Sequence, residues 1–240
     1  VRTGAGLVTV GTPASAYPIV AGKCLEEMPY PLPEHDGRAA LAGYDGIRQK
    51  IAGCDAALIG PGMGRGVESD ALICRLTAEI SQPLILDADG INAVSAHIDS
   101  LDGRRGRVTV LTPHDGEFAR LGGDVTHGGR IRAARDFACA HGCVLVLKGH
   151  RTIIAAPDGR IAINTTGNSG MAKGGSGDAL SGMLLALLGQ GVPAYEAACS
   201  AVWLHGRAGD LAAASLGEHG MLPSDLIGQI SHAILPLEKK

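Results

Sequence analysis

Short apolar runs alternate with longer segments of helical periodicity along most of the chain. The runs are rich in β-branched residues and are bounded by Gly, Pro or Asp, which is typical of strands. Because the runs are apolar on both faces, they predict a parallel sheet that helices cover on each side. The predicted strands are Leu7–Val10, Ala56–Ile59, Leu84–Asp87, Val108–Leu111 and Val144–Lys148.

Helices are predicted between and after these strands. The segments TIIAA and IAIN flank the turn sequence PDGR and predict a β-hairpin around Pro157–Arg160. The Pro-rich segment Met28–Gly37 is interpreted as a long surface loop. The order of the elements predicts an α/β fold in a single domain over residues 1–240. The predicted helices are Val67–Ile80, Ile91–Ala96, Gly116–Leu121, Arg130–His141, Asp178–Leu188, Tyr195–Ala214 and Ser224–Ala233.

Composition argues against several classes of protein. The 21 Lys and Arg residues do not outnumber the 24 Asp and Glu residues, so the chain lacks the basic excess of a nucleic-acid-binding protein. No apolar run reaches the roughly 20 residues of a membrane span, and no charged start followed by an apolar segment suggests export. We therefore expect a cytoplasmic protein with no nucleic-acid partner and no membrane partner. The six cysteines form no CxxC pair and are interpreted as reduced thiols.

Glycine, acidic and basic residues follow four of the predicted strands directly. The segments after residues 59, 87, 111 and 148 begin GPGMGRG, ADGIN, TPHDGE and GHRT. Ligands of open α/β sheets bind outside the carboxyl ends of the strands. We therefore expect these segments to line one crevice.

The segment GGSG at residues 174–177 precedes an apolar predicted helix. Glycines let the backbone approach an anion, and a helix N-terminus presents free N–H groups and a positive dipole end. The segment therefore predicts a phosphate-binding loop. It is not a Walker A loop, because Ser176 rather than Lys follows Gly175.

Two roles are open for Asp178 at the start of that helix. An aspartate at a helix N-terminus is most often a cap. A carboxylate beside bound phosphate repels it, however, so a purely structural role would be unfavourable there. A general base that takes the proton of an attacking hydroxyl explains the position better.

Taken together, the motifs GPGMG, DADGIN, TPHDGE, LKGHRT and GNSGMAKGGSGDALSGMLLALLGQG resemble the ADP/ATP-dependent NAD(P)H-hydrate dehydratase family. This family is a carbohydrate-kinase-like branch of the ribokinase-like superfamily. The resemblance extends over nearly the whole chain and implies a three-layer sandwich, with a central, mainly parallel sheet covered by helices on both faces. It also implies an enzyme that repairs hydrated NADH and NADPH by phosphorylating the C6 hydroxyl and eliminating phosphate.

The resemblance further implies ligands and site residues. Mg²⁺ is the implied cofactor, ADP or ATP the co-substrate, and a homo-oligomer, by resemblance a tetramer, the implied assembly. Gly64, His114 and Asp178 are implied to bind the hydrated dinucleotide, with Asp178 as the catalytic base. The sequence offers no dedicated metal-binding cluster, so phosphates and water are expected to hold the ion. The residues implied to hold the adenine nucleotide are Lys148, Gly149, His150, Arg151, Thr152, Asn168, Gly174, Gly175, Ser176 and Gly177.

Simpler alternatives exist for two of these residues. His114 follows a strand and Pro113, so it is also a candidate cap of the next helix. Lys148 ends an apolar strand, where a lysine commonly extends its ammonium into solvent.

Members of the family carry a strand, a glycine-containing turn and a helix before the segment that corresponds to RTGAGLVTV. We find no segment within residues 1–240 that corresponds to these elements. We therefore expect this domain to lack its N-terminal strand and helix.

Two other functions are weighed against the dehydratase. A small-molecule kinase of the same superfamily, acting on a hydroxymethylpyrimidine, a thiazole alcohol or a sugar, is disfavoured by TPHDGE. A non-catalytic module that binds adenine nucleotide is disfavoured by Asp178 beside an intact glycine loop.

Overall fold

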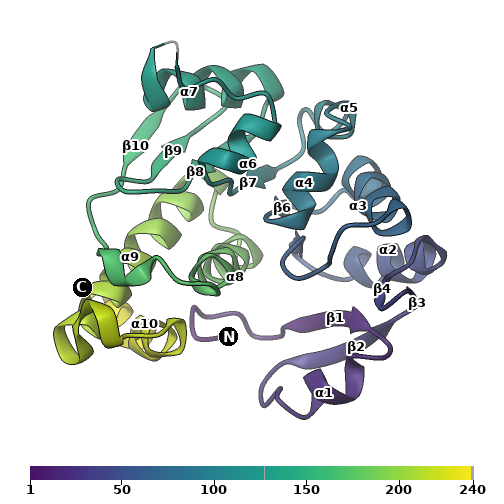
Figure 1. Ribbon diagram of the computed structural model, residues 1–240, viewed down its shortest axis with the longest axis horizontal. Helices are drawn as coiled ribbons and strands as arrows, with labels where there is room; N and C mark the ends of the chain where they lie inside the picture. The colour runs from purple at the N-terminus through teal and green to yellow at the C-terminus, as the bar shows by residue number, and fades with distance from the viewer. Residues whose placement is uncertain (127, 239–240) are drawn as a thin grey trace.

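The computed structural model describes residues 1–126 and 128–238. In this part of the chain the centre is a six-stranded sheet with the order β10-β9-β8-β7-β6-β5 (Figure 1). Strands β5 to β8 are parallel to one another, and β9 pairs antiparallel with both β8 and β10. The predicted parallel sheet and the predicted hairpin are therefore confirmed. The strands are β5 Ala57–Ile59, β6 Leu84–Leu86, β7 Thr109–Leu111, β8 Val144–Leu147, β9 Ile153–Ala155 and β10 Ile161–Ile163.

Helices cover both faces of this sheet and make a three-layer structure. The first face carries α2 Tyr44–Ala52, α3 Val67–Glu79, α4 Asp89–Ser95, α5 Asp99–Asp102, α6 Asp115–Arg120 and α7 Gly129–His141. The second face carries α8 Ser176–Gly189, α9 Ala194–Gly220 and α10 Pro223–Glu238.

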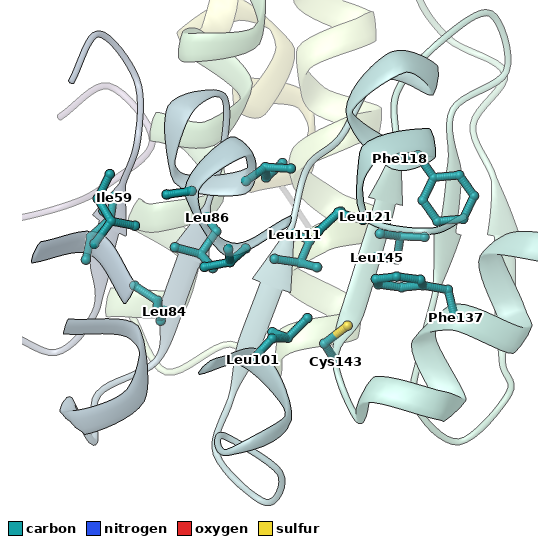
Figure 2. Packing of buried hydrophobic residues seen from close by; sticks show 14 of the residues in the cluster. Ile59, Leu84, Leu86, Leu101, Leu111, Phe118, Leu121, Phe137, Cys143 and Leu145 are labelled. Carbon is teal, nitrogen blue, oxygen red and sulfur yellow. The ribbon is translucent and has the colours of Figure 1, made fainter. Parts of the chain in front are cut away.

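Each face has its own apolar core, because successive side chains of a strand point to opposite faces. Leu84 and Leu86 of β6 belong to the first core, and Ile85 between them belongs to the second. Figure 2 shows the first core, in which Phe118 of α6 and Phe137 of α7 lie beside the strands. The two rings are in edge contact, with centroids 5.4 Å apart. Burying one such side chain stabilises the fold by about 1.5–3 kcal/mol, so this core holds α6 and α7 firmly to the sheet.

The N-terminal segment forms a separate two-stranded parallel sheet. Its strands are β1 Thr9–Pro13 and β2 Met28–Leu32, with α1 Tyr17–Ala21 between them (Figure 1). The strand predicted at residues 7–10 begins two residues later in the structure, and its assignment to the central sheet is wrong. Three short elements lead from β2 to α2, namely β3 Glu34–His35, β4 Arg38–Ala39 and the 3₁₀ helix η1 Leu41–Gly43.

The interpretation of the Pro-rich segment as a surface loop is also wrong, since it contains β2 and β3. The N–H of Met28 donates to Val8, and Ala14 donates to Leu32, so every second residue of β2 faces β1. Pro29 and Pro31 occupy the alternate positions, whose backbone faces away from β1. Proline is tolerated in such an edge strand because it removes no hydrogen bond of the ladder.

The helices predicted from the sequence are present with shifts of a few residues at their ends. For example, α8 begins at Ser176 rather than Asp178, and α9 extends to Gly220, with non-helical backbone at Gly217. The short helices α1, α2 and α5 were not predicted. All six cysteines have free thiols. None of the helices within residues 1–126 and 128–238 combines the length and the apolarity that a membrane crossing needs.

Candidate active site

The turns that follow β5 and β6 lie in direct backbone contact. Gly60 has a φ of +133°, and a Cβ built on it would lie 1.8 Å from the carbonyl oxygen of Asp87. On the other turn, a Cβ on Gly90 would lie 2.4 Å from the carbonyl oxygen of Ile59. Only glycine fits at these two positions. The contact fixes the GPGMG and DADGIN segments against each other at the ends of their strands.

Gly64 lies farther along the turn after β5. Its φ is +72°, and its N–H donates to Asp89 Oδ2 at 2.9 Å. A Cβ on Gly64 would lie 2.9 Å from Nε of Arg38, which belongs to β4. Gly64 thus exposes its backbone between a carboxylate and a guanidinium. Sequence reasoning missed Arg38 because it follows the segment that was interpreted as a surface loop.

Asp87 and Lys148 form an ion pair at the ends of β6 and β8. Lys148 Nζ donates to Asp87 Oδ1 at 2.8 Å, and the hydroxyl of Ser181 in α8 donates to Asp87 Oδ2 at 2.7 Å. The side chain of Asp87 is 2% exposed and that of Lys148 is 21% exposed. The alternative in which Lys148 extends into solvent is therefore wrong. The pair joins two strand ends to α8.

His114 caps α6, which confirms the cap that the sequence predicts as one of two roles for this residue. Its Nδ1 accepts from the N–H of Gly116 at 3.0 Å and of Glu117 at 3.3 Å, and Glu117 Oε2 accepts from the N–H of His114 at 2.9 Å. This reciprocal arrangement is a capping box. Because Nδ1 accepts, the proton of the neutral ring lies on Nε2. The side chain is 56% exposed, and its Nε2 lies 3.6 Å from Glu117 Oε1.

The glycine loop leads into α8 with the geometry of an anion site. Gly175 is the N-cap with a φ of +94°, and Ser176 begins the helix. A Cβ on Gly174 would meet nothing within 4 Å, whereas a Cβ on Gly177 would lie 3.6 Å from Lys148 Nζ. The loop therefore leaves open space beside free N–H groups, and an ammonium stands at its edge.

Asp178 lies in the first turn of α8 and is exposed. The helix has no side-chain cap, so the alternative in which Asp178 is the N-cap is wrong. Across residues 1–126 and 128–238, the carboxylate of Asp178 finds no hydrogen-bond or ion-pair partner. It is therefore free to accept a proton.

The segment Lys148–Thr152 forms a loop after β8 that α7 fixes in place. Arg130 of α7 donates to the carbonyl oxygen of Lys148 at 2.8 Å and pairs with Asp115 at 3.0 Å. A Cβ on Gly149, whose φ is +151°, would lie 2.8 Å from Arg130. His150 and Arg151 are exposed. Sequence reasoning did not single out Arg130, because one arginine among several in a helix carries no signal of this contact.

Asn168 is held by α9. Its Oδ1 accepts from the N–H of Gly170 at 3.0 Å, and its Nδ2 donates to Asp210 Oδ1 at 3.0 Å. Asp210 also accepts from the N–H of Gly167 at 3.1 Å. The amide of Asn168 is thus engaged in local structure, and its contact with a phosphate stays a prediction. Asp210 was missed because it lies inside a helix, 42 residues from its partner.

His205 supports the start of α8 from behind. Its Nε2 lies 2.9 Å from the carbonyl oxygen of Ser176 and 3.3 Å from its hydroxyl. Burial lowers the pKa of His205 to about 4, so the ring is neutral at pH 7. The sequence showed no role for His205. The apolar stripe of α9 that includes Ala201, Val202 and Ala208 places it on the buried face.

These contacts bring the four strand ends and α8 together, as the crevice prediction requires. Lys148 Nζ, paired with Asp87, also lies 3.8 Å from Glu117 Oε2 after β7. A cavity of about 1490 Å³ adjoins this arrangement between the N-terminal segment, β5 and α8. Met63 and Ala179, the chain neighbours of Gly64 and Asp178, line it. Gly64, His114, Lys148 and Asp178 themselves lie outside that lining, so the cavity lies beside the site.

Within the described residues, no group of three or more His, Cys, Asp or Glu side chains is arranged to hold a metal ion. Asp87 and Glu117 are engaged by Lys148 and by the cap of α6, and Asp89 accepts from Gly64. These acidic groups therefore have other partners.

The fold resembles solved structures of known description. An ADP/ATP-dependent NAD(P)H-hydrate dehydratase from Bacillus subtilis, co-crystallised with ATP and Mg²⁺, superposes with a TM-score of 0.76. It is 29% identical, and the match covers 98% of this chain and 80% of that one. A ribokinase-like superfamily protein from Enterococcus faecalis gives a TM-score of 0.82 at 28% identity, covering 98% of this chain and 78% of that one. The three-layer structure is thus a ribokinase-like fold.

Sequence comparison leads to the same group. The bifunctional NAD(P)H-hydrate repair enzyme Nnr of Moorella thermoacetica is 39% identical over 243 residues, which cover 100% of this chain. The chain spans 46% of the length of that relative. A family model described as NAD(P)H-hydrate dehydratase matches residues 1–232, almost the whole chain. The family resemblance of the motifs at the four strand ends and in the glycine loop is therefore confirmed. The chain belongs to the NAD(P)H-hydrate dehydratase family.

Proposed function

We propose that this chain is a nucleotide-dependent NAD(P)H-hydrate dehydratase and that residues 1–240 form a single domain. It phosphorylates the C6 hydroxyl of hydrated NADH or NADPH with ATP or ADP as the donor. Elimination of phosphate then regenerates the reduced dinucleotide. Membership of the family and the names of the M. thermoacetica and B. subtilis relatives support this proposal.

The observation that carries the proposal is the free carboxylate of Asp178 directly after the glycine loop. Asp178 accepts the proton of the C6 hydroxyl while the oxygen attacks the terminal phosphorus of the nucleotide. The bond from that phosphorus to the leaving nucleotide breaks. The lone pair of the ring nitrogen then expels phosphate from C6, and loss of a proton from C5 restores the double bond.

The nucleotide binds with its phosphates at the N-terminus of α8. Two observations support this placement: the open space at Gly174, and the 3.6 Å between Lys148 Nζ and the position that a Cβ of Gly177 would take. Free N–H groups and an ammonium together stabilise the charge of a transferring phosphoryl group. The adjacent loop Lys148–Thr152, which Arg130 fixes, holds the rest of the nucleotide.

The hydrated dinucleotide binds on the other side of Asp178. The cavity of about 1490 Å³ that Met63 and Ala179 line supports this assignment, since it exceeds the roughly 300–1,000 Å³ of most small-molecule sites and can hold a large ligand. His114 presents its Nε2–H to an acceptor of the substrate, and Gly64 lets the ligand approach the backbone.

Mg²⁺ is proposed as the metal, and when bound it offsets charge during phosphoryl transfer. The donors available fit an ion held mainly by phosphate oxygens and water, because the acidic side chains near the site are engaged elsewhere.

A homo-oligomer, and specifically a tetramer, is proposed from the family resemblance. Light scattering of the purified chain measures that assembly directly.

The direct test is to mix the protein with hydrated NADH and either ADP or ATP and to follow the absorbance of reduced nicotinamide. We expect the absorbance to return with at least one of the two nucleotides. Nucleotide binding without any return identifies a binding module instead. Transfer of phosphate to a hydroxymethylpyrimidine or thiazole alcohol, again without return, identifies a small-molecule kinase.

Asp178→Asn tests the proposed base. The substitution keeps the shape of the side chain but removes the proton acceptor, so we expect turnover to fall by roughly 10²–10⁴-fold. Nucleotide affinity should be kept or increased, because a neutral amide does not repel phosphate. Near-normal turnover in a folded Asp178→Asn protein contradicts the catalytic role of Asp178.

A further inference from the structure

Three groups donate hydrogen bonds to the carboxylate of Asp87 where β6, β8 and α8 meet. Lys148 Nζ and the N–H of Ala88 reach Oδ1 at 2.8 and 2.9 Å, and the hydroxyl of Ser181 reaches Oδ2 at 2.7 Å. Asp87 is 1% exposed. A carboxylate this deeply buried and fully engaged influences a reaction through its neighbours, not by touching a substrate.

The backbone beside Asp87 is strained. Ala88 has a φ of +49° and a ψ of −116°, which a residue with a Cβ rarely adopts. In this conformation its N–H donates to Asp87 Oδ1. Strain of this kind persists only where the surrounding structure enforces it, and it is concentrated at functional sites. The position of the Asp87 carboxylate is therefore maintained at an energetic cost.

The partner of Asp87 that faces the site is Lys148. Its Nζ lies 2.8 Å from Asp87 Oδ1 and 3.6 Å from the position that a Cβ of Gly177 would take. The ammonium has three N–H donors, so after one hydrogen bond to Asp87 others remain for a phosphate at the start of α8. Asp87 thus holds the ammonium at the place where the glycine loop leaves room for an anion.

A second carboxylate competes for the same ammonium. Glu117 Oε2 lies 3.8 Å from Lys148 Nζ and belongs to α6. If Asp87 carried no charge, Glu117 would be the nearest anionic partner, and the ammonium would shift toward α6. The charge of Asp87 therefore decides where Lys148 Nζ stands relative to α8.

We propose that Asp87 is a positioning residue that fixes the ammonium of Lys148 for phosphoryl transfer at the N-terminus of α8. This inference rests on the proposed function and adds to it a residue that acts through Lys148. It predicts an effect on the chemical step, because a displacement of about 1 Å at a reacting group can lower the rate by about 10²-fold.

The test compares Asp87→Asn with Ser181→Ala, which removes a different hydrogen bond from the same carboxylate. For Asp87→Asn we expect kcat to fall by about 10²-fold while KM for ADP or ATP stays within about threefold. For Ser181→Ala we expect a much smaller loss of kcat, because the ion pair with Lys148 remains. Equal losses in the two variants, or an unchanged kcat in Asp87→Asn, overturn the inference.

A double-mutant cycle with Lys148→Met shows whether Asp87 acts through Lys148. We expect Asp87→Asn to have little further effect on kcat once Lys148 is replaced, since the two residues form one unit. If the fold-loss of kcat in the double variant equals the product of the losses in the two single variants, Asp87 acts independently of Lys148, and the inference is overturned.

A measurement without catalysis separates this inference from the proposed function. Acetylation of Lys148 by a soluble acylating reagent, quantified by mass spectrometry, reports how firmly its ammonium is held. We expect faster acetylation in Asp87→Asn than in Ser181→Ala and in the unmodified chain. Equal rates overturn the positioning role even if the chain is a dehydratase. Absence of turnover in the unmodified chain contradicts the proposed function, while the acetylation rates still decide whether Asp87 holds Lys148.

Discussion

The imidazole of His114 has two nitrogens with separate tasks. Nδ1 closes the capping box of α6, and Nε2 lies 3.6 Å from Glu117 Oε1 in a side chain that is half exposed. Fixing one nitrogen also fixes the orientation of the ring and the position of the proton on the other. The cap and the proposed ligand contact are therefore complementary roles of one residue, although the sequence presents them as alternatives.

Two substitutions separate these roles. His114→Ala removes the cap and the donor, so we expect a loss of about 1 kcal/mol of stability together with weaker binding of hydrated NADH. His114→Asn keeps a good cap but does not supply the imidazole N–H, so only dinucleotide binding should weaken. Calorimetric titration with both ligands and thermal melting provide the measurements. Equal losses of ADP and dinucleotide affinity would indicate a damaged fold.

His205 makes the free energy of unfolding depend on pH in the acidic range. Its pKa is about 4 in the folded protein and about 6.5 in the unfolded chain, so below pH 6.5 the unfolded chain binds the proton more readily. Its contribution to stability is complete above pH 6.5 and falls as the pH drops toward 4, by about 3 kcal/mol in all. Urea titrations at pH 7 and pH 4.5 measure this loss. His205→Gln should show a smaller loss over the same interval, and an equal loss would assign the acid sensitivity to other groups.

At the scale of elements, α8 connects the site to the core. The glycine loop leads into its first turn, which carries Asp178, whereas Leu180, Met183 and Leu184 are buried in the second core. Ser181 is anchored to Asp87 and Ser176 to His205. The N-terminus of α8 is therefore immobilised from two sides before any ligand binds, and preorganised donors of this kind are effective in stabilising developing charge.

Gly177→Val tests the glycine loop within this element. The new side chain would stand beside Lys148 Nζ and narrow the approach to the helix N–H groups, so we expect the Kd for ADP to rise about tenfold or more. The fold should persist, because a Cβ at this position meets no backbone. Gly228→Val is the matched control, since Gly228 lies in α10 with open space around it. Unchanged ADP affinity in Gly177→Val would remove the loop from the nucleotide site.

Several elements of the site could be predicted because their signal is local. Apolar runs followed by glycine and acidic residues identify the strand ends, and GGSG before an apolar helix identifies the anion loop. Contacts between distant segments leave no such pattern. Arg104 is buried and donates to backbone oxygens of Thr77, Ile80, Gln82 and Val108, yet in the sequence it stands beside Arg105 and Arg107 without distinction. Arg38 and Arg130 were missed for the same reason.

At the scale of the whole molecule, the two cores share one sheet. The backbone contact between Gly60 and Gly90 and the ion pair of Asp87 and Lys148 both lie at the same edge of that sheet. The site is therefore attached to the most buried part of the protein. The N-terminal sheet is different, because none of the buried core residues belongs to β1 or β2.

That difference implies unequal local stability. The strands β6 and β7 are fully buried, whereas β1 and β2 have mostly intermediate or exposed residues and lie outside the central ladder. Opening the small sheet exposes little apolar surface and leaves the central hydrogen bonds intact, so its free energy of opening should be far below that of global unfolding. In deuterium exchange followed by mass spectrometry, we expect peptides of β1 and β2 to exchange well before those of β6 and β7. Equal protection would contradict this. Because β1 and β2 line the same cavity as Ala179, early opening of this small sheet would give a large ligand a route into the cavity.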